Sequence, residues 1–249
     1  VYQKAINEFH SMRANYFRST GNARKDSMMR LIQQITLLLR ISAAPNTVKE
    51  YTGGMPVKLA KVMEMLQDMP DDIVAIGVRH KIVVDAYAAA IHSVMPDRPL
   101  FVVTGDTTTI AQRRKLRQTL KESGNGILLC TQQSLPSSVN FEYVDKVIIP
   151  ELHYNNSRMS QFYMRFVRFT SQHEKDIYFV TYLGSIESNQ MQMVLAKEKI
   201  NLFMRGKETD LDEIYDTFGV DYNLLEALMR REEDKDGHFQ IHWGQQEIS

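Results

Sequence analysis

Two arginines in an aromatic segment are the residues of this sequence best suited to bind a phosphorylated ligand. Arg165 and Arg168 are three positions apart, so in a helix over 161–168 their guanidinium groups project in the same direction. Paired guanidiniums bind phosphate oxygens bidentately and stabilise charge that develops on a transferred phosphoryl group. Phe162, Phe166 and Phe169 are predicted to lie on one side of that helix, with Tyr163 and Val167 near them. On spacing alone, an amphipathic helix with two surface arginines is the simpler interpretation.

Polar loops follow four apolar runs of the sequence and add further candidates for phosphate binding. Their hydroxyl, amide and cationic donors suit phosphate oxygens better than apolar ligands. If the runs are parallel strands, all four loops lie beyond one edge of a sheet, where open α/β sheets bind their ligands. A single polar loop would be explained by helix capping, but the four together favour a ligand. The loops are 79–81, 104–109, 131–140 and 151–156.

The second of these loops leads into a strongly basic helix. Thr107 or Thr108 is in position to cap that helix, and a helix N-terminus with cations in its first turns can bind phosphate. The same residues would serve equally well as a solvated basic face, and the two interpretations have equal weight. The cations are Arg113, Arg114, Lys115, Arg117 and Lys121.

The elements that must position these loops alternate between short apolar runs and helical stretches. Helices are predicted at 82–95 and 110–120, between the first three runs. Continuous β-branched runs separated by helices indicate parallel strands that are buried on both faces and joined by right-handed crossovers. The sequence therefore predicts an α/β fold in which helices flank a parallel sheet. The predicted strands are 73–78, 100–103, 127–130, 147–149 and 177–180.

The first 70 residues have helical periodicity throughout. Asp26 and Ser27 are predicted to begin a helix, because apolar residues follow them at helical spacing. The pattern stops at Ala43, and Pro45 is the expected breaker. We therefore predict a helical lead-in over 1–70 that packs on the sheet domain.

The remaining chain divides at about residue 205. Residues 71–205 carry the predicted sheet, and 206–249 are polar with short helix candidates at 210–218 and 222–231. The predicted organisation is thus an α/β domain preceded by a helical lead-in and followed by a C-terminal helical extension.

Charge and cysteine content exclude several classes of function. The 249 residues include 30 basic and 30 acidic side chains, so a nucleic-acid partner would have to meet a local basic face. The single cysteine, Cys130, permits no intrachain disulfide and no four-cysteine zinc site, and no metal site is expected in this chain. No apolar run is long enough to cross a bilayer, so no membrane partner is expected. The predicted location is the cytoplasm.

In their order along the chain, these features resemble the C-terminal helicase-type lobe of the Swi/Snf family of double-stranded-DNA translocases. Gln161, Arg165 and Arg168 match the family's Gln-x-x-x-Arg-x-x-Arg motif at its expected spacing. Asn140 occupies the place of an asparagine in the preceding motif, and 153–156 stands where a Trp-Asn-Pro turn normally lies. The first of these matches is specific, and the others support the resemblance mainly through their order along the chain.

The resemblance spans residues 1 to about 205 and implies the second RecA-like lobe of an ATP-dependent motor. In this family ATP and Mg²⁺ bind between two lobes, and the first lobe supplies the lysine loop and the Mg²⁺ ligands. Nothing like Gly-Lys-Ser/Thr occurs here. The chain alone is therefore predicted to be inactive as an ATPase, with double-stranded DNA and the first lobe as its partners.

The resemblance also implies roles residue by residue. Arg168 would lie nearest the γ-phosphate and Arg165 would support it. Further contacts with the nucleotide would come from Gln161, Ser138 and Asn140. The DNA backbone would be contacted by Arg79, Gly105, Asp106, Arg113, Thr131 and Gln132.

This sequence departs from the family at glycines of two motifs. Residues 135–138 replace the glycines of the fifth motif, and Met164 replaces the glycine before Arg165. Glycine loss removes easy approach of the backbone to a ligand. Because Asn140 and both arginines are retained, we favour a divergent bacterial or phage branch. The alternative is a non-catalytic interaction module on a RecA-like scaffold, in which the arginines bind a protein.

Overall fold

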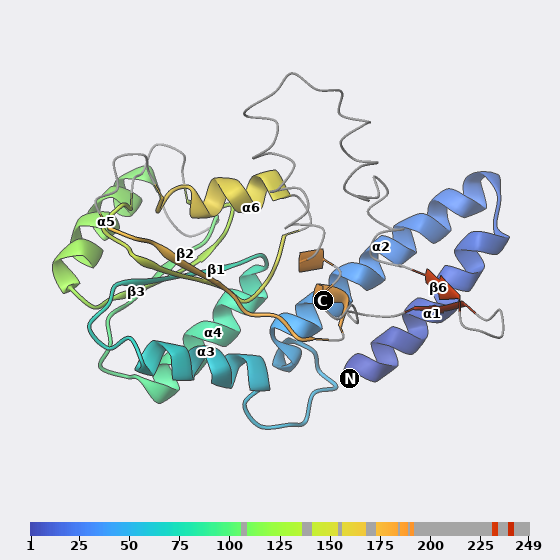
Figure 1. Cartoon of the computed structure of the whole chain (residues 1–249), viewed down its shortest axis with the longest axis horizontal. Helices are drawn as coiled ribbons and strands as arrows, with labels where there is room; N and C mark the ends of the chain where they lie inside the picture. The colour runs from blue at the N-terminus through green and yellow to red at the C-terminus, as the bar shows by residue number, and fades with distance from the viewer. Residues whose placement is uncertain are drawn as a thin grey trace, which may run out of the picture. The chain divides into compact units, whose positions relative to one another are not determined.

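The computed structural model describes residues 1–105, 109–135, 141–153, 156–167, 173–183, 185–188, 190–191, 231–233 and 239–241. The chain forms two compact units, 1–180 and 181–249. The first unit contains the large sheet and the helices around it (Figure 1). In chain order its elements are α1 (Tyr2–Arg18), α2 (Gly21–Ala43), η1 (Pro45–Thr47), α3 (Val57–Gln67), β1 (Val74–Val78), α4 (Lys81–Val94), β2 (Leu100–Val103), α5 (Ile110–Ser123), β3 (Ile127–Thr131), β4 (Lys146–Ile149), α6 (Asn156–Tyr163) and β5 (Asp176–Phe179).

The five strands of this unit form one sheet in the order β2-β3-β1-β4-β5. Every neighbouring pair is parallel. The central strands β1 and β3 are buried along their whole length, as continuous apolar runs require in a sheet covered on both faces. Parallel pairing brings the carboxyl ends of all five strands to one edge. The predicted α/β fold with a parallel sheet is confirmed.

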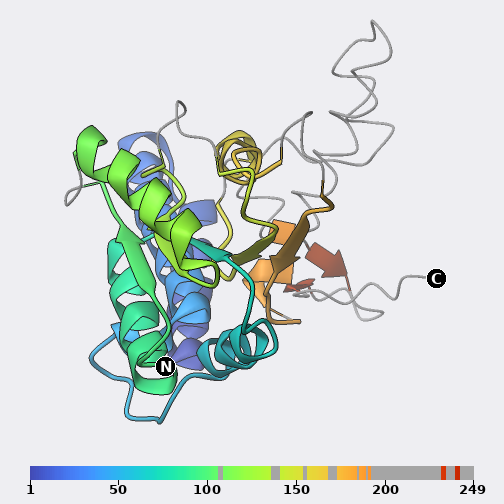
Figure 2. The same cartoon turned by 90° about the vertical axis from the view of Figure 1, so that its left-hand side faces the viewer.

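Different helices cover the two faces of the sheet, as both views show (Figures 1 and 2). On one face, α3 and α4 pack against Val74, Ile76 and Val78 of β1, which are part of the main apolar core. On the other face lie α5 and α6, and Phe162 of α6 packs directly over Gly77 of β1. Alternate residues of β1 therefore serve two separate layers of helices.

The lead-in is a hairpin of the helices α1 and α2. Gly21 begins α2 with φ of 59°, a backbone angle that favours glycine at the turn. The predicted start at Ser27 is therefore wrong, because the helix begins six residues earlier and Ser27 lies within it. The Ser27 hydroxyl instead accepts from Ser19 at 3.4 Å. Farther along, the buried Gln34 joins the two helices by donating to the Ala5 carbonyl at 2.9 Å.

The end of α2 meets the sheet domain. The helix ends at Ala43, immediately before the 3₁₀ turn that Pro45 begins, as the sequence predicts. Tyr87 of α4 is completely buried, and its hydroxyl donates to the Ala43 carbonyl at 3.4 Å. Ala43 also belongs to the same apolar core as α3, α4 and β1. The hairpin and the sheet domain thus share one core.

A single arginine ties together the amino-terminal edge of the sheet. The Arg98 guanidinium donates to the carbonyls of Leu66, Met69, Asp72 and, through Nε, Asn125, at 2.5 to 2.9 Å. Partial burial lowers the pKa of Arg98, and nearby aspartates oppose that shift. Because these carbonyls precede β1 and β3, Arg98 holds the start of both strands against the end of α3.

The second unit contains two short strands among its described residues. β6 (Arg231–Glu233) and β7 (Phe239–Ile241) pair antiparallel. The helix predicted at 210–218 lies outside the described residues, and so does the helix predicted at 222–231 except for Arg231, which is in a strand instead. The domain boundaries predicted near residues 70 and 205 stay predictions. Across the described ranges, no helix has the length and apolarity that crossing a bilayer requires.

Candidate functional site

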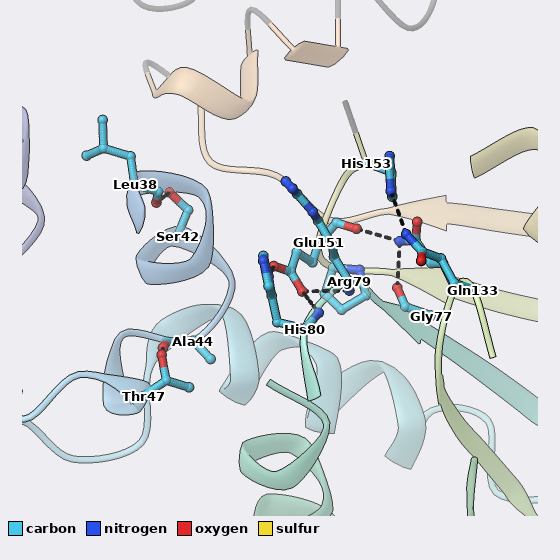
Figure 3. Close-up of polar contacts among 12 residues, drawn as sticks. Leu38, Ser42, Ala44, Thr47, Gly77, Arg79, His80, Gln133, Glu151 and His153 are labelled. Carbon is cyan, nitrogen blue, oxygen red and sulfur yellow. Dashed lines mark hydrogen bonds and ion pairs between the residues drawn. The ribbon is translucent and has the colours of Figure 1, made fainter. Parts of the chain in front are cut away.

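A buried carboxylate organises the carboxyl edge of the sheet. Glu151, which follows β4, is 1 % exposed. Its Oε2 accepts from the backbone N–H of Arg79 at 2.7 Å and of His80 at 3.1 Å. Its Oε1 lies 2.5 Å from Nδ1 of His80 (Figure 3). One carboxylate therefore fixes the loop between β1 and α4, on which a predicted DNA contact, Arg79, lies.

The Glu151 carboxylate also serves as a cap for α4. His80 is the N-cap residue of that helix, and its own side chain makes no capping hydrogen bond. A carboxylate at this position satisfies backbone donors and interacts favourably with the positive end of the helix dipole. Sequence reasoning missed this role of Glu151, although an acidic residue directly after a buried strand was the available signal.

Gln132 joins three strands at the same edge. Its backbone N–H donates to Val78 at 2.8 Å, and its Nε2 donates to the carbonyls of Gly77 at 3.2 Å and Glu151 at 2.7 Å. Gln132 is 3 % exposed, and its Oε1 has no hydrogen-bond partner in the described part of the chain. The amide group of the side chain predicted to contact DNA thus donates to backbone carbonyls of the protein.

Neighbouring polar residues extend this arrangement on both sides. The buried Lys58 of α3 donates to the Pro150 carbonyl at 3.1 Å, which fixes the residue before Glu151. Beyond it, Nε2 of Gln133 lies 3.1 Å from Nε2 of His153 (Figure 3). These contacts hold the loops after β3 and β4 in one arrangement.

Arg165 lies in a turn that follows α6 and not in a helix. The sequence predicts that Arg165 and Arg168 project from one helix, but α6 ends at Tyr163. The backbone then tightens, because Arg165 and Phe166 donate to the carbonyls three residues before them. This correction removes the helical argument for two parallel guanidiniums. Arg168 itself lies outside the described residues.

Two observations locate Arg165 relative to the sheet. Its carbonyl accepts from the backbone N–H of Phe141 at 3.3 Å, which joins the turn to the loop before β4. Burial raises the pKa of the Cys130 thiol in β3, and the positive charge of Arg165 opposes that rise. The guanidinium is therefore close enough to the end of β3 for its charge to act there.

Aromatic packing holds that turn in place. Phe162 and Phe166 are completely buried, and their rings meet edge to face with centroids 5.3 Å apart. Phe141, from the loop before β4, packs on Phe166 at 6.0 Å. The phenylalanines predicted to share one side of a helix do pack together at 162 and 166, but Phe166 lies in the turn after α6 and Phe169 lies outside the described residues. The burial of Phe162 and Phe166 anchors the segment that carries Arg165.

The structure brings several predicted residues to one edge and leaves others undescribed. Gly105 is exposed beyond β2, and a Cβ at this glycine would lie 4.0 Å from Oγ of Ser134, so the loops after β2 and β3 are adjacent. Thr131 is buried, and its hydroxyl contacts that of Ser134. Gln161 is exposed on α6. The predicted site residues outside the described part of the chain are Asp106, Ser138, Asn140 and Arg168.

The cap of α5 differs from the predicted one. Thr109, and neither of the two threonines before it, caps this helix. Its hydroxyl accepts from the Gln112 backbone N–H at 3.3 Å, and the Gln112 Oε1 accepts from the Thr109 N–H at 2.8 Å. This reciprocal capping box satisfies two backbone donors at the start of the helix. Arg113 lies in its first turn.

The described residues offer no candidate metal centre. Among them, no group of three or more histidine, cysteine, aspartate or glutamate side chains comes together in a way that could hold an ion. The donors at the sheet edge are instead amides, hydroxyls and cations, which bind anionic oxygens.

The fold resembles solved structures of SWI2/SNF2 ATPases. The ATPase core of Sulfolobus solfataricus in complex with dsDNA aligns with a TM-score of 0.66 at 15% identity, covering 92% of this chain and 47% of that chain. The C-terminal domain of the same ATPase aligns at 0.58 and 16% identity, covering 92% and 93%. The C-terminal part of the Fun30 ATPase domain aligns at 0.51 and 18% identity, covering 71% and 59%.

These likenesses show the fold, which is an α/β RecA-like fold. The chain spans about half the length of the Sulfolobus ATPase core that it matches. No protein-family model matches the chain, and no curated protein matches it.

Proposed function

We propose that this chain is the second motor lobe of an ATP-dependent translocase on double-stranded DNA. The observation that carries the proposal is the position of Arg165, in a turn that buried phenylalanines anchor against a RecA-like sheet, with its charge acting at the carboxyl end of β3. Cations at this edge are suited to bind the phosphates of a nucleotide held against the lobe. The similarity in fold to a C-terminal SWI2/SNF2 domain supports the same conclusion.

On the nucleotide side, the lobe contributes positive charge and leaves metal binding to a partner. We assign the γ-phosphate to Arg168, with Arg165 beside it to stabilise charge that develops during phosphoryl transfer. Gln161, Ser138 and Asn140 complete the nucleotide contacts in this proposal. Mg²⁺ accompanies the ATP, and its ligands belong to the first lobe. Opening and closing of the two lobes around ATP would then drive movement along the duplex.

On the DNA side, backbone contacts arise from loops at the same edge. Arg79, Gly105, Asp106 and Arg113 are the residues of the chain that we assign to phosphate contact. Thr131 and Gln132 belong to this surface as well, but their buried side chains leave little area for a direct contact. Their part in the proposal is therefore to fix the loops after β1 and β3, mainly through the carbonyls that Gln132 binds.

An ATPase assay tests this proposal. The chain alone is expected to show no DNA-stimulated ATP hydrolysis, because its sequence has no Gly-Lys-Ser/Thr loop and the Mg²⁺ ligands belong to the first lobe in this proposal. Joined to a first lobe, in one polypeptide or as an added chain, it should support hydrolysis that rises with duplex DNA. Substantial hydrolysis by the chain alone would contradict the proposal. Unchanged hydrolysis by the first lobe whether or not this chain is present would favour an interaction module. A cytoplasmic location and a bacterial or phage source stay predictions.

A further inference from the structure

We propose that the exposed face of α5 binds the phosphate backbone of duplex nucleic acid. This surface, which we call the α5 stripe, consists of Arg114, Lys115, Arg117 and Lys121. It extends beyond the loops at the sheet edge and would give the lobe a second contact with the duplex. The inference rests on the proposed function for the presence of DNA, but it concerns a different surface and is tested separately.

No carboxylate in the described part of the chain neutralises the positive charge of the α5 stripe. All four side chains are exposed. None of them forms an ion pair with a carboxylate among the described residues. The only acidic residue of α5 is Glu122, and its carboxylate accepts from Gln118 at 2.6 Å. Because the chain as a whole has a net charge of zero, this is a local concentration of charge.

The spacing of the α5 stripe matches the spacing of phosphates. Arg114, Arg117 and Lys121 follow one another at intervals of three and four residues, so they form a row along one side of the helix. A rise of about 1.5 Å per residue makes the row roughly 10 Å long. Phosphates on one strand of a duplex follow at about 3.4 Å along the axis, so the row spans about three of them.

The inner side of α5 is anchored, which fixes the direction of the stripe. Leu120 is completely buried, and a Cβ on Gly126 would lie 2.9 Å from both its Cδ1 and the ring of Phe101 in β2. The hydroxyl of Tyr143 donates to the Arg117 carbonyl at 2.9 Å. The helix therefore presents its cations to solvent from a fixed backbone, so that only their side chains have to become ordered on binding.

The position and composition of α5 favour a duplex backbone over other polyanions. The helix follows β2 and so begins at the edge where Gly105 and the Arg79 loop lie. A bound duplex could therefore continue from that edge along the stripe. No aromatic residue occurs in α5, so the surface lacks the stacking platforms that bind the bases of single strands. Point charges without base readout produce binding that is independent of sequence.

Binding of a labelled 20-base-pair duplex by the 249-residue chain tests the α5 stripe. Fluorescence anisotropy should be measured between about 25 and 200 mM salt, for the chain and for a variant with Arg114→Gln, Arg117→Gln and Lys121→Gln. Loss of three phosphate contacts should reduce the slope of log affinity against log salt by about 3 and weaken binding on the order of tenfold at low salt. Unchanged affinity and slope would overturn the proposal.

A matched variant separates the stripe from net charge. Arg18, Lys25 and Arg30 are exposed cations of the α1–α2 hairpin, and their replacement by Gln removes the same charge. This variant should retain the slope of the unchanged chain. Equal losses in the two variants would overturn the proposal, because binding would then follow total charge. Equally tight binding of polyglutamate that also depends on the stripe would overturn it in favour of an acidic protein partner.

A loop variant distinguishes this inference from the proposed function. If Arg79→Gln weakens binding and the stripe variant does not, the proposed track at the sheet edge stands and the stripe is refuted. The opposite result would support the stripe and contradict the role of Arg79. Complete absence of duplex binding by the unchanged chain would overturn the stripe and the DNA contacts of the proposed function together.

Discussion

The ring of Phe162 lies directly on the backbone of Gly77, so that a Cβ on this glycine would overlap two carbons of the ring. Gly77 is in the middle of a central strand, and Phe162 is near the end of α6. Glycine in a strand commonly marks such a close approach. The absence of a side chain at Gly77 thus allows α6 to lie against the sheet. It also determines how far above the sheet the turn that carries Arg165 begins.

Replacing Gly77 by alanine should destabilise the protein. The added methyl group must displace a completely buried ring, and overpacking of this kind costs about 1–3 kcal/mol. Urea denaturation measures the change in the free energy of unfolding. Gly54→Ala is the matched control, because a Cβ on Gly54 meets nothing within 4 Å, and it should be nearly neutral. Equal stabilities of the two variants would show that the ring moves away without cost.

Replacing Glu151 by alanine should also lower stability. The change leaves the backbone N–H groups of Arg79 and His80 without their acceptor, at a cost of about 2–4 kcal/mol for the pair. Glu151→Gln retains one acceptor oxygen and should cost less. Thermal or urea denaturation at neutral pH measures the order of stability of these variants. Glu64→Ala, which removes an exposed ion pair with Lys61, should change stability by under about 1 kcal/mol. An Ala variant of Glu151 as stable as this control would disprove the capping role.

The strands were predictable because the physics behind them is local. Each predicted run lies within one residue of the observed strand at both ends, since continuous apolar runs have little alternative in a buried parallel sheet. Helix starts were less predictable. Ser27 had the residue type of a cap, but the turn at Gly21 begins α2 earlier. Several hydroxyl residues precede α5, and only the reciprocal bond with Gln112 selects Thr109.

The site was predictable only in part, because its decisive contacts join distant segments. Order along the chain placed Arg79 and Gly105 at one edge, and parallel pairing confirms it. Sequence could not show that Gln132 is buried, since its amide binds the carbonyls of Gly77 and Glu151 on other strands. The sequence also predicted a helix that continues through Arg165. In the structure a tight turn replaces the helix there, next to the buried aromatic residues.

Buried acidic groups predict a loss of stability at alkaline pH. Burial raises the pKa of the Cys130 thiol above its ordinary value of 9.0, so the folded state keeps a proton that the unfolded state releases. Stability from this group is complete below about pH 9 and falls by up to about 1.4 kcal/mol per pH unit above it. Partial burial of Tyr143 raises the pKa of its phenol as well, and this adds a smaller loss above pH 10 because solvent screens a group that is partly exposed.

A cysteine-free variant measures the share of Cys130. Cys130→Ala should be less stable at neutral pH because it leaves a small cavity in β3. Between pH 9 and 10, however, its free energy of unfolding should fall by about 1 kcal/mol less than that of the unchanged protein. Urea denaturation at closely spaced pH values checks the slope. Parallel curves for the two proteins would mean that the thiol titrates alike in the folded and unfolded states.

Replacing Arg168 by alanine should abolish most of the motor activity without releasing DNA. In the chain joined to a first lobe, loss of a guanidinium that stabilises the transferred phosphoryl group should lower DNA-stimulated turnover by about 10³-fold. Arg165→Lys keeps a charge but loses bidentate geometry, so a clear though smaller reduction is expected.

Arg18→Ala, which removes an exposed cation of the hairpin, is the control and should retain full turnover. Duplex affinity should stay within about twofold in all three variants, because the two arginines face the nucleotide in this proposal. Full turnover of the Arg168 variant would remove Arg168 from the ATP site, and a matching loss of duplex affinity would place it on the DNA instead.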